Sequence, residues 1–120
     1  MTEARLELGR WGEEEAARFL KKKGLKILER NLRTPLGEID LIVRDRKFLV
    51  FVEVKTRRSA SHGRPQEAVG PAKQRQIIHS AQWYLAAEKR EDLQPRFDVV
   101  AVTPGSRGAE IEHIVDAFGV

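Results

Sequence analysis

The chain contains no cysteine and no long hydrophobic run. Without cysteine, disulfide bonds and zinc–thiolate sites are excluded. A lack of disulfide bonds is usual for proteins of a reducing compartment. The longest apolar run, residues 48–52, is far too short to cross a bilayer, so no membrane partner is expected. The first residues include the charged Glu3 and Arg5 and lack the apolar core of a signal peptide. We therefore expect a cytoplasmic protein.

Aromatic residues are also scarce, at 7%, but hydrophobic residues of all kinds make up 41% of the 120 residues and charged residues 33%. This balance is typical of a folded globular chain rather than a disordered one. The length fits one domain over residues 1–120, which can bury a core without covalent staples. The net charge of +4 and the pI near 9.7 favour a polyanionic partner, above all a nucleic acid.

The hydrophobic pattern predicts two helices and five strands. A helix over 6–23 ends in three lysines before Gly24, and a second helix begins at Pro71 and runs to about residue 89. Strands are predicted over 25–32 (an edge strand), 38–43, 48–55, 97–103 and 109–115, with turns at 34–37, 44–47 and 104–108. The second helix then acts as a crossover that makes strand 97–103 parallel to strand 48–55. We expect an α/β fold with a central mixed sheet flanked by helices.

Carboxylates stand inside two otherwise apolar strands, Asp40 in the first and Glu53, followed by Lys55, in the second. A buried ionisable group is costly unless its charge is compensated, and a divalent metal is a common compensator. If Val43 and Phe48 close the hairpin, all three lie on one face, with Asp40 and Glu53 as diagonal neighbours roughly 7–8 Å apart at Cα. A slip of one residue would separate them. The arrangement Asp…Glu-x-Lys therefore predicts the metal site of a nuclease.

Other ionisable residues leave alternatives open. Glu38 is either a third acidic ligand or a charge at the end of its strand. Asp98 is interpreted as a salt-bridge partner of Arg96 or as a buried structural charge, and His113 as structural. His62 lies in the basic loop 56–70 and is interpreted as solvated or phosphate-contacting.

Basic residues form two stretches along the sequence. The first contains Lys21, Lys22, Lys23, Lys26, Arg30 and Arg33, and the second, around the Glu-x-Lys strand, contains Arg44, Arg46, Lys47, Arg57, Arg58 and Arg64. A solvated charged face would explain either stretch, but the second flanks the predicted site. The side chains expected to contact nucleic acid are Arg57, Arg58, Arg64, Lys73 and Arg75.

Several motifs together resemble the YraN family, a bacterial family of small endonuclease-like proteins. They are Gly9-Arg-Trp-Gly12-Glu13, Gly37-Glu38-Ile39-Asp40-Leu41-Ile42, Phe51-Val52-Glu53-Val54-Lys55-Thr56-Arg57, Lys73-Gln74 and Arg96-Phe97-Asp98-Val99-Val100. The family is similar to the restriction-endonuclease-like superfamily and, within it, to archaeal Holliday-junction resolvases. The resemblance covers nearly the whole chain and implies a restriction-endonuclease-like fold, a complete Asp…Glu-x-Lys site and a helical glutamate.

The residue types suggest how such a site would work. Magnesium, with manganese as a substitute, prefers oxygen ligands, and the expected ligands are Asp40, Glu53 and the carbonyl of Val54. The ion would polarise the scissile phosphate, while Lys55 orients water and stabilises the charge that develops at phosphorus. Glu13 is expected to hold a water of the metal or a second ion.

Helical geometry selects Glu13 from three consecutive glutamates. At about 100° per residue, Ala16 and Leu20 share its face, so Glu13 lies on the buried stripe. Glu14 lies instead among surface partners such as Arg10 and Arg18. The alternative for Glu13 is a charge that favours the helix dipole.

Two functions from different classes follow. In the first, the chain is a magnesium-dependent endonuclease that acts on DNA, with branched or recombining DNA as a candidate substrate. In the second, it is a non-catalytic nucleic-acid-binding module that retains the nuclease fold. Cutting two strands as a resolvase does would require a symmetric homodimer.

Overall fold

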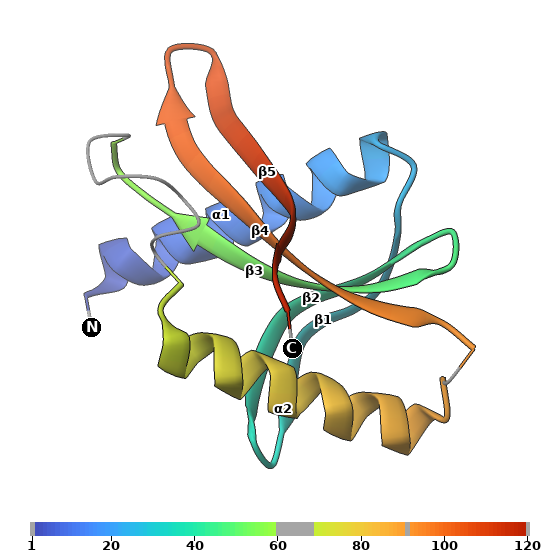
Figure 1. Cartoon of the computed structure of the whole chain (residues 1–120). Helices are drawn as coiled ribbons and strands as arrows, with labels where there is room; N and C mark the ends of the chain where they lie inside the picture. The colour runs from blue at the N-terminus through green and yellow to red at the C-terminus, as the bar shows by residue number, and fades with distance from the viewer. Residues whose placement is uncertain (1, 60–68, 91, 120) are drawn as a thin grey trace.

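The computed structural model describes residues 2–59, 69–90 and 92–119. Its elements follow the order expected from the sequence (Figure 1). They are α1 (Glu3–Lys22), β1 (Lys26–Thr34), β2 (Gly37–Asp45), β3 (Phe48–Thr56), α2 (Pro71–Glu88), β4 (Gln94–Gly105) and β5 (Gly108–Phe118). None of the helices in the described ranges is long and apolar enough to cross a membrane. Arg64 and His62 lie outside the described residues.

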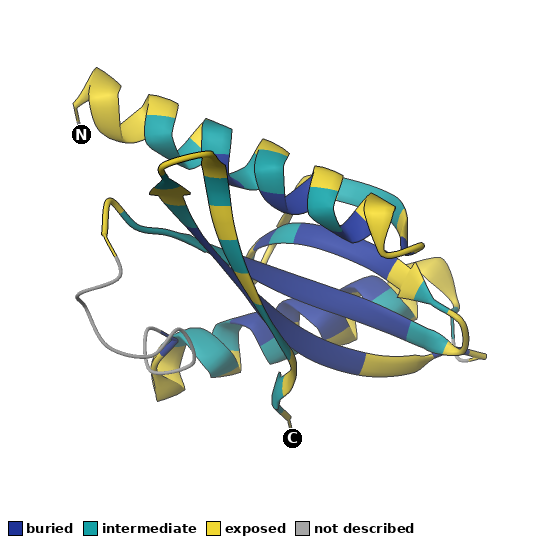
Figure 2. Cartoon of the chain, turned by 90° about the horizontal axis from the view of Figure 1, so that it is seen from above, coloured by how far each residue is buried: buried dark blue, intermediate teal, exposed yellow. Residues whose placement is uncertain are grey.

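The five strands form one mixed sheet in the order β1-β2-β3-β4-β5. β3 and β4 are parallel, and the other neighbours are antiparallel, as the crossover through α2 predicts. α1 covers one face of the sheet and α2 the other (Figure 2). The predicted α/β class is confirmed, and the arrangement is compatible with a restriction-endonuclease-like fold.

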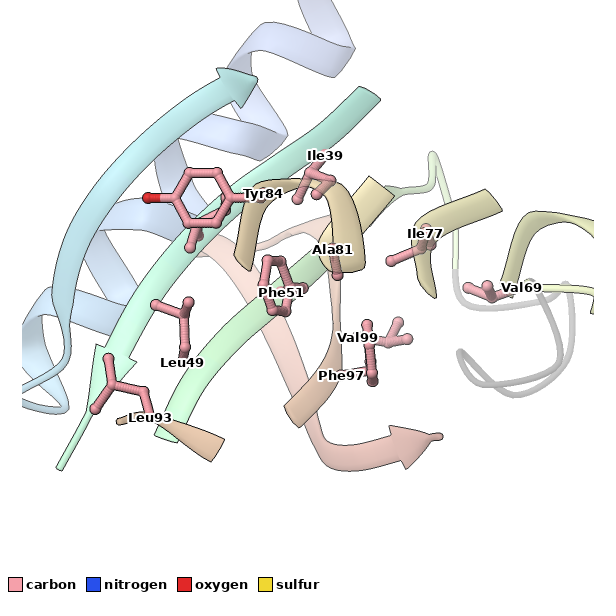
Figure 3. Packing of buried hydrophobic residues seen from close by; sticks show 11 residues of the cluster. Ile39, Leu49, Phe51, Val69, Ile77, Ala81, Tyr84, Leu93, Phe97 and Val99 are labelled. Carbon is pink, nitrogen blue, oxygen red and sulfur yellow. The ribbon is translucent and has the colours of Figure 1, made fainter. Parts of the chain in front are cut away.

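Each helix packs on its own hydrophobic layer. The layer under α1 contains Ala16, Ala17, Leu20, Leu25, Leu41, Val43, Val50, Val52, Val100 and Val102. The layer under α2 contains Ile39, Ile42, Leu49, Phe51, Val69, Ile77, Ala81, Tyr84, Leu93, Phe97 and Val99 (Figure 3). Because β3 and β4 supply residues to both layers, these two central strands are buried from both sides.

Helix boundaries follow local capping chemistry. α1 begins at Glu3, one turn before the predicted start, because the Oγ1 of Thr2 accepts a hydrogen bond from the N–H of Arg5 and caps the helix. At its other end, Gly24 has a φ of +91°, as predicted for a left-handed position. α2 begins at Pro71 as predicted.

The β2–β3 hairpin is tighter than predicted. Asp45 pairs with Phe48, so only residues 46 and 47 form the turn, and Arg46 takes a φ of +56° there. Val43 therefore lies opposite Val50 rather than Phe48, a shift of two residues. The predicted register is wrong, but a shift of two keeps the side chains of the paired stretch, residues 41–45, on their predicted faces.

β2 also departs from strict alternation. Leu41 and Val43 pack under α1, but Ile39, predicted on the same face, packs under α2 together with Ile42. The change occurs where the pairing of β2 with β3 stops at Leu41, while its pairing with β1 continues. Freed from β3, this end of β2 can twist away from the central sheet.

Asp98 on β4 is a structural charge, as expected. Its carboxylate accepts two hydrogen bonds of 2.9 Å from Arg96 and one of 2.9 Å from the N–H of Asp116. His113 Nε2 lies 2.8 Å from the same carboxylate, and its Nδ1 lies 2.9 Å from Lys23 Nζ. Since lysine only donates, the ring accepts at Nδ1 and donates at Nε2. Burial alone would raise the pKa of Asp98, but the hydrogen bonds from His113, Arg96 and Asp116 outweigh it and lower that pKa.

Gly12 allows α1 to approach β3 closely. A Cβ at this position would lie 1.9 Å from the Oγ1 and 2.9 Å from the Cβ of Thr56, so rotating the threonine would not make room. Gly9, one turn earlier, would meet nothing within 4 Å.

We predict opposite effects of alanine at these two glycines. Gly12→Ala should lower the free energy of unfolding by about 1–3 kcal/mol, because α1 must move away from β3. Gly9→Ala should raise it by about 0.5–1 kcal/mol through better helix propensity. Urea unfolding of both variants measures the difference, and an equal response of the two would contradict the close approach at Gly12.

Candidate active site

A carboxylate pair forms where β2 and β3 separate. The backbone pairing of the two strands ends at Leu41 and Val52, and continuing it would set Asp40 directly opposite Glu53. There the Oδ2 of Asp40 accepts a hydrogen bond of 2.9 Å from the N–H of Val54. The aspartate side chain thus takes the place of a backbone carbonyl at the end of the ladder. The two acids meet, as directly facing residues and not as the predicted diagonal neighbours.

The pKa of Glu53 is shifted far from its ordinary value. Its side chain is only 7% exposed. Burial is the largest cause that raises its pKa, followed by a hydrogen bond with Asp40 and by the negative charge of Asp40. Two lysines oppose these effects, Lys73 more strongly than Lys55, yet the pKa of Glu53 still rises from 4.5 to about 8. At neutral pH Glu53 therefore keeps its proton.

Lys73 reaches the pair from α2. Its Nζ lies 3.8 Å from Glu53 Oε2. It stands in the first turn of α2, where the positive end of the helix dipole disfavours a cation. The sequence does contain a signal for this contact. A lysine in the first turn of a helix is unfavourable unless an anion lies nearby. Lys73 was predicted only as a nucleic-acid contact, and its proximity to Glu53 was missed.

Glu13 approaches from α1, next to the close contact at Gly12. It is half-buried, and its pKa is raised by burial first, then by the charges of Asp40 and Glu38. Its two neighbours turn away from the pair. Glu14 pairs with Arg30 at 3.0 Å and Glu15 with Arg18 at 3.3 Å. The predicted rotation of the helix is therefore confirmed, although Glu14 pairs with a residue of β1 and not with one of its own helix.

Glu38 lies at the margin of this group. It is exposed and forms a 2.9 Å ion pair with Arg33 across the β1–β2 hairpin. Its charge nevertheless contributes to the raised pKa of Glu13. The geometry thus favours a charge at the strand end, the second of the two alternatives.

The second basic stretch divides between the two ends of β3. Arg57 follows β3 and is half-buried, with its N–H bonded to the carbonyl of Val102 at 2.9 Å, while Arg58 and Arg75 are exposed. Arg44, Arg46 and Lys47 were predicted to surround the Glu-x-Lys strand. They lie at its other end, because β3 extends from Phe48 to Thr56 between them and Arg57.

Asp40 and Glu53 offer oxygen donors of the kind that magnesium binds. Among the described residues, no three His, Cys, Asp or Glu side chains form a group that could hold an ion. Two facing carboxylates are nevertheless sufficient for magnesium, which commonly uses one or two carboxylates and takes further oxygens from water and phosphate. The residues present fit such an ion.

Comparison with known proteins identifies the family. The model of the family described as "Uncharacterised protein family UPF0102" matches residues 12–102. A UPF0102 protein of Syntrophotalea carbinolica is 60% identical over 120 residues, covering 100% of this chain and 98% of the relative. Relatives from Geotalea daltonii and Chlorobium phaeobacteroides are 54% and 49% identical, over 92% and 93% of this chain and 88% and 94% of their own lengths. As the motifs predicted, this chain belongs to the uncharacterised family UPF0102, the YraN family.

Proposed function

We propose that the chain is a magnesium-dependent endonuclease that acts on DNA, with branched or recombining DNA as its substrate class. One observation carries the proposal. Asp40 and Glu53 meet where β2 and β3 separate, and burial, followed by the hydrogen bond with Asp40 and its charge, raises the pKa of Glu53 to about 8. Removing a counter-charge from buried carboxylates is costly, so the pair favours cation binding.

The chain would bind magnesium through Asp40, Glu53 and the carbonyl of Val54. When bound, this ion supplies Lewis-acid activation of a phosphodiester and of water. Lys55 lies two residues after Glu53 and so on the same face of β3, where its ammonium can donate to the phosphate oxygens as charge develops. Glu13 would hold a water of the metal or a second ion, and burial together with the charges of Asp40 and Glu38 raises its pKa.

Phosphate recognition around the pair would come from nearby cations. Arg57 and Arg58 follow directly on β3, and Lys73 and Arg75 lie in the first turns of α2. Lys73 already contacts Glu53, so a cation bound between the carboxylates would release it toward a phosphate. Arg64 belongs to the same proposed set by sequence.

Cleavage of defined DNA tests the proposal. Labelled duplex, single-stranded and four-way-junction DNA should be incubated with the protein, with and without magnesium or manganese. Metal-dependent nicking by the wild type but not by Asp40→Asn supports an endonuclease. Tight binding to all three substrates without cleavage by any preparation would support the non-catalytic binding module instead. The molar mass in solution then shows whether a homodimer is present to cut both strands.

We predict a pH-dependent gain in stability from Glu53→Gln. The folded-state pKa of about 8 lies above the ordinary 4.5, so the folded protein holds a proton that the unfolded chain releases. The wild type should therefore lose stability as the pH rises from about 5 to about 8, whereas Glu53→Gln should not. Urea unfolding of metal-free protein across this range measures both slopes, and parallel slopes would refute the raised pKa.

We predict that manganese binding requires both carboxylates. Calorimetric titration should give a binding heat with the wild type, and Asp40→Asn or Glu53→Gln should abolish it while the fold is retained. Because the ion displaces the proton of Glu53, the wild-type heat should also depend on the ionisation enthalpy of the buffer. Identical heats in the three proteins would rule out this site.

We predict that Glu13 is the glutamate of α1 that matters for cleavage. Glu13→Gln should reduce metal-dependent cleavage at least tenfold, because of the three consecutive glutamates it is Glu13 whose pKa is raised by the charge of Asp40. Glu14→Gln and Glu15→Gln are matched controls on the same turn and should change the rate little. A large loss with Glu14→Gln alone would overturn the assignment.

A further inference from the structure

Two basic stretches that are separate in the sequence meet at one end of the molecule. Lys26 at the start of β1 pairs directly with Arg44 at the end of β2. The C-terminal end of α1, the start of β1 and the β2–β3 turn gather at the right of Figure 1. We call this surface the basic end; it comprises Lys21, Lys22, Lys23, Lys26, Arg44, Arg46 and Lys47, all of them exposed.

The basic end is grooved. A depression of about 720 Å³ is lined by Lys23, Gly24, Asp45, Arg46, Lys47 and Phe48. A second depression of about 430 Å³ is lined by Lys21 and residues 25–30. Concave surfaces that carry several cations suit a chain of phosphates better than a single small anion.

Positive side chains outnumber negative ones in these grooves, although Arg30 is paired with Glu14 at 3.0 Å. Glu29 and Asp45 are the acidic residues in the two linings, and Asp45 is already paired with Arg96 at 3.0 Å. Lys23 is held in place because its ammonium donates to His113 Nδ1 at 2.9 Å. Arg44 is held by a 3.1 Å hydrogen bond from its Nε to the carbonyl of Arg46. The fold thus keeps like charges close together, which a bound polyanion would relieve.

The basic end connects to the candidate site. Arg30 lines the 430 Å³ depression and also a smaller one of about 190 Å³ that includes Arg10, Glu13 and Asn31. Glu13 and Lys21 are eight residues apart on α1, which at about 1.5 Å per residue is about 12 Å along the helix. This distance corresponds to about four base pairs of duplex at about 3.4 Å each.

We infer that the basic end is a second nucleic-acid contact surface, which binds backbone phosphates of a strand whose reacting phosphate lies about four or more base pairs away, beside Glu13. The position of the reacting phosphate rests on the proposed function, whereas binding at the basic end does not need the carboxylates. An anionic lipid surface would share the phosphate chemistry. Arg30, which lines both the 430 Å³ depression and the 190 Å³ depression beside Glu13, favours a nucleic acid that reaches the candidate site.

The test compares two variants that lose the same charge. Arg44→Gln/Arg46→Gln/Lys47→Gln removes three cations of the basic end, and Arg5→Gln/Lys89→Gln/Arg107→Gln removes three exposed cations elsewhere. Binding of a labelled 16-base-pair duplex is followed by fluorescence anisotropy from about 50 to 300 mM salt. Since each phosphate contact contributes about 0.9 to the slope of log affinity against log salt, the first variant should flatten that slope by roughly two to three. Its affinity at about 100 mM salt should fall at least tenfold, and that of the control less than threefold.

Two results would overturn the inference. Equal losses in both variants would show that only net charge matters. Unchanged DNA affinity, together with lost binding to vesicles of anionic and neutral phospholipid, would assign the surface to a membrane. Lys21→Gln/Lys22→Gln/Lys26→Gln repeats the test from α1 and β1 if the first variant does not fold.

Asp40→Asn/Glu53→Gln separates this inference from the proposed nuclease. In one outcome no preparation binds manganese or cleaves DNA, but the basic-end variant still shows a flatter dependence of log affinity on log salt. The proposed nuclease then fails and the contact surface stands. If the carboxylate variant loses metal binding and cleavage while the basic-end variant binds DNA as the wild type does, the contact surface fails and the nuclease stands.

Discussion

The hydrogen bond from the Val54 N–H to the carboxylate of Asp40 is the contact on which the site depends. It ends the β2–β3 ladder with a side chain in place of a backbone carbonyl, so the two strands can separate without leaving that N–H unpaired. The same contact fixes Asp40 opposite Glu53. Because Glu53 is buried among apolar residues of β3, the pair cannot be relieved by solvent and needs a proton or a cation. A local feature of strand pairing thereby sets the electrostatics of the whole site.

The two helices bring their polar groups to this point from opposite faces of the sheet. On one side, Gly12 lets α1 approach Thr56 and so carries Glu13 toward Asp40. On the other, Gly37 lies against Gln76, where a side chain on the glycine would meet the glutamine at 2.1 Å, and α2 in turn presents Lys73 to Glu53. The carboxylate pair therefore has an acidic residue of α1 on one side and a cationic residue of α2 on the other.

Much of this arrangement could be predicted from the sequence, since apolar alternation and capping residues are local signals. The number and order of elements, the parallel β3–β4 pair and the choice of Glu13 all followed from periodicity. The hairpin register did not, because it depends on whether Arg46 accepts a left-handed φ, which tightened the turn by two residues. The packing of Ile39 under α2 and the contact of Lys73 with Glu53 were not predicted, for a similar reason. The twist of β2 and the approach of α2 arise from tertiary packing that no neighbouring residue encodes.

Two buried acids on adjacent strands differ in how the fold compensates their charge. Asp98 packs on the α1 side of β4, where Arg96, His113 and a backbone N–H satisfy its charge with fixed hydrogen bonds, and its pKa falls. Glu53 lies on the α2 side of β3, has another acid as its nearest polar neighbour, and its pKa rises to about 8. The first group has all its compensation within the fold and gains nothing from a ligand. The charges of Lys73, at 3.8 Å, and of Lys55 compensate the second only in part, so a divalent cation can still improve its free energy. Burial alone does not mark a site; incomplete compensation of a buried charge does.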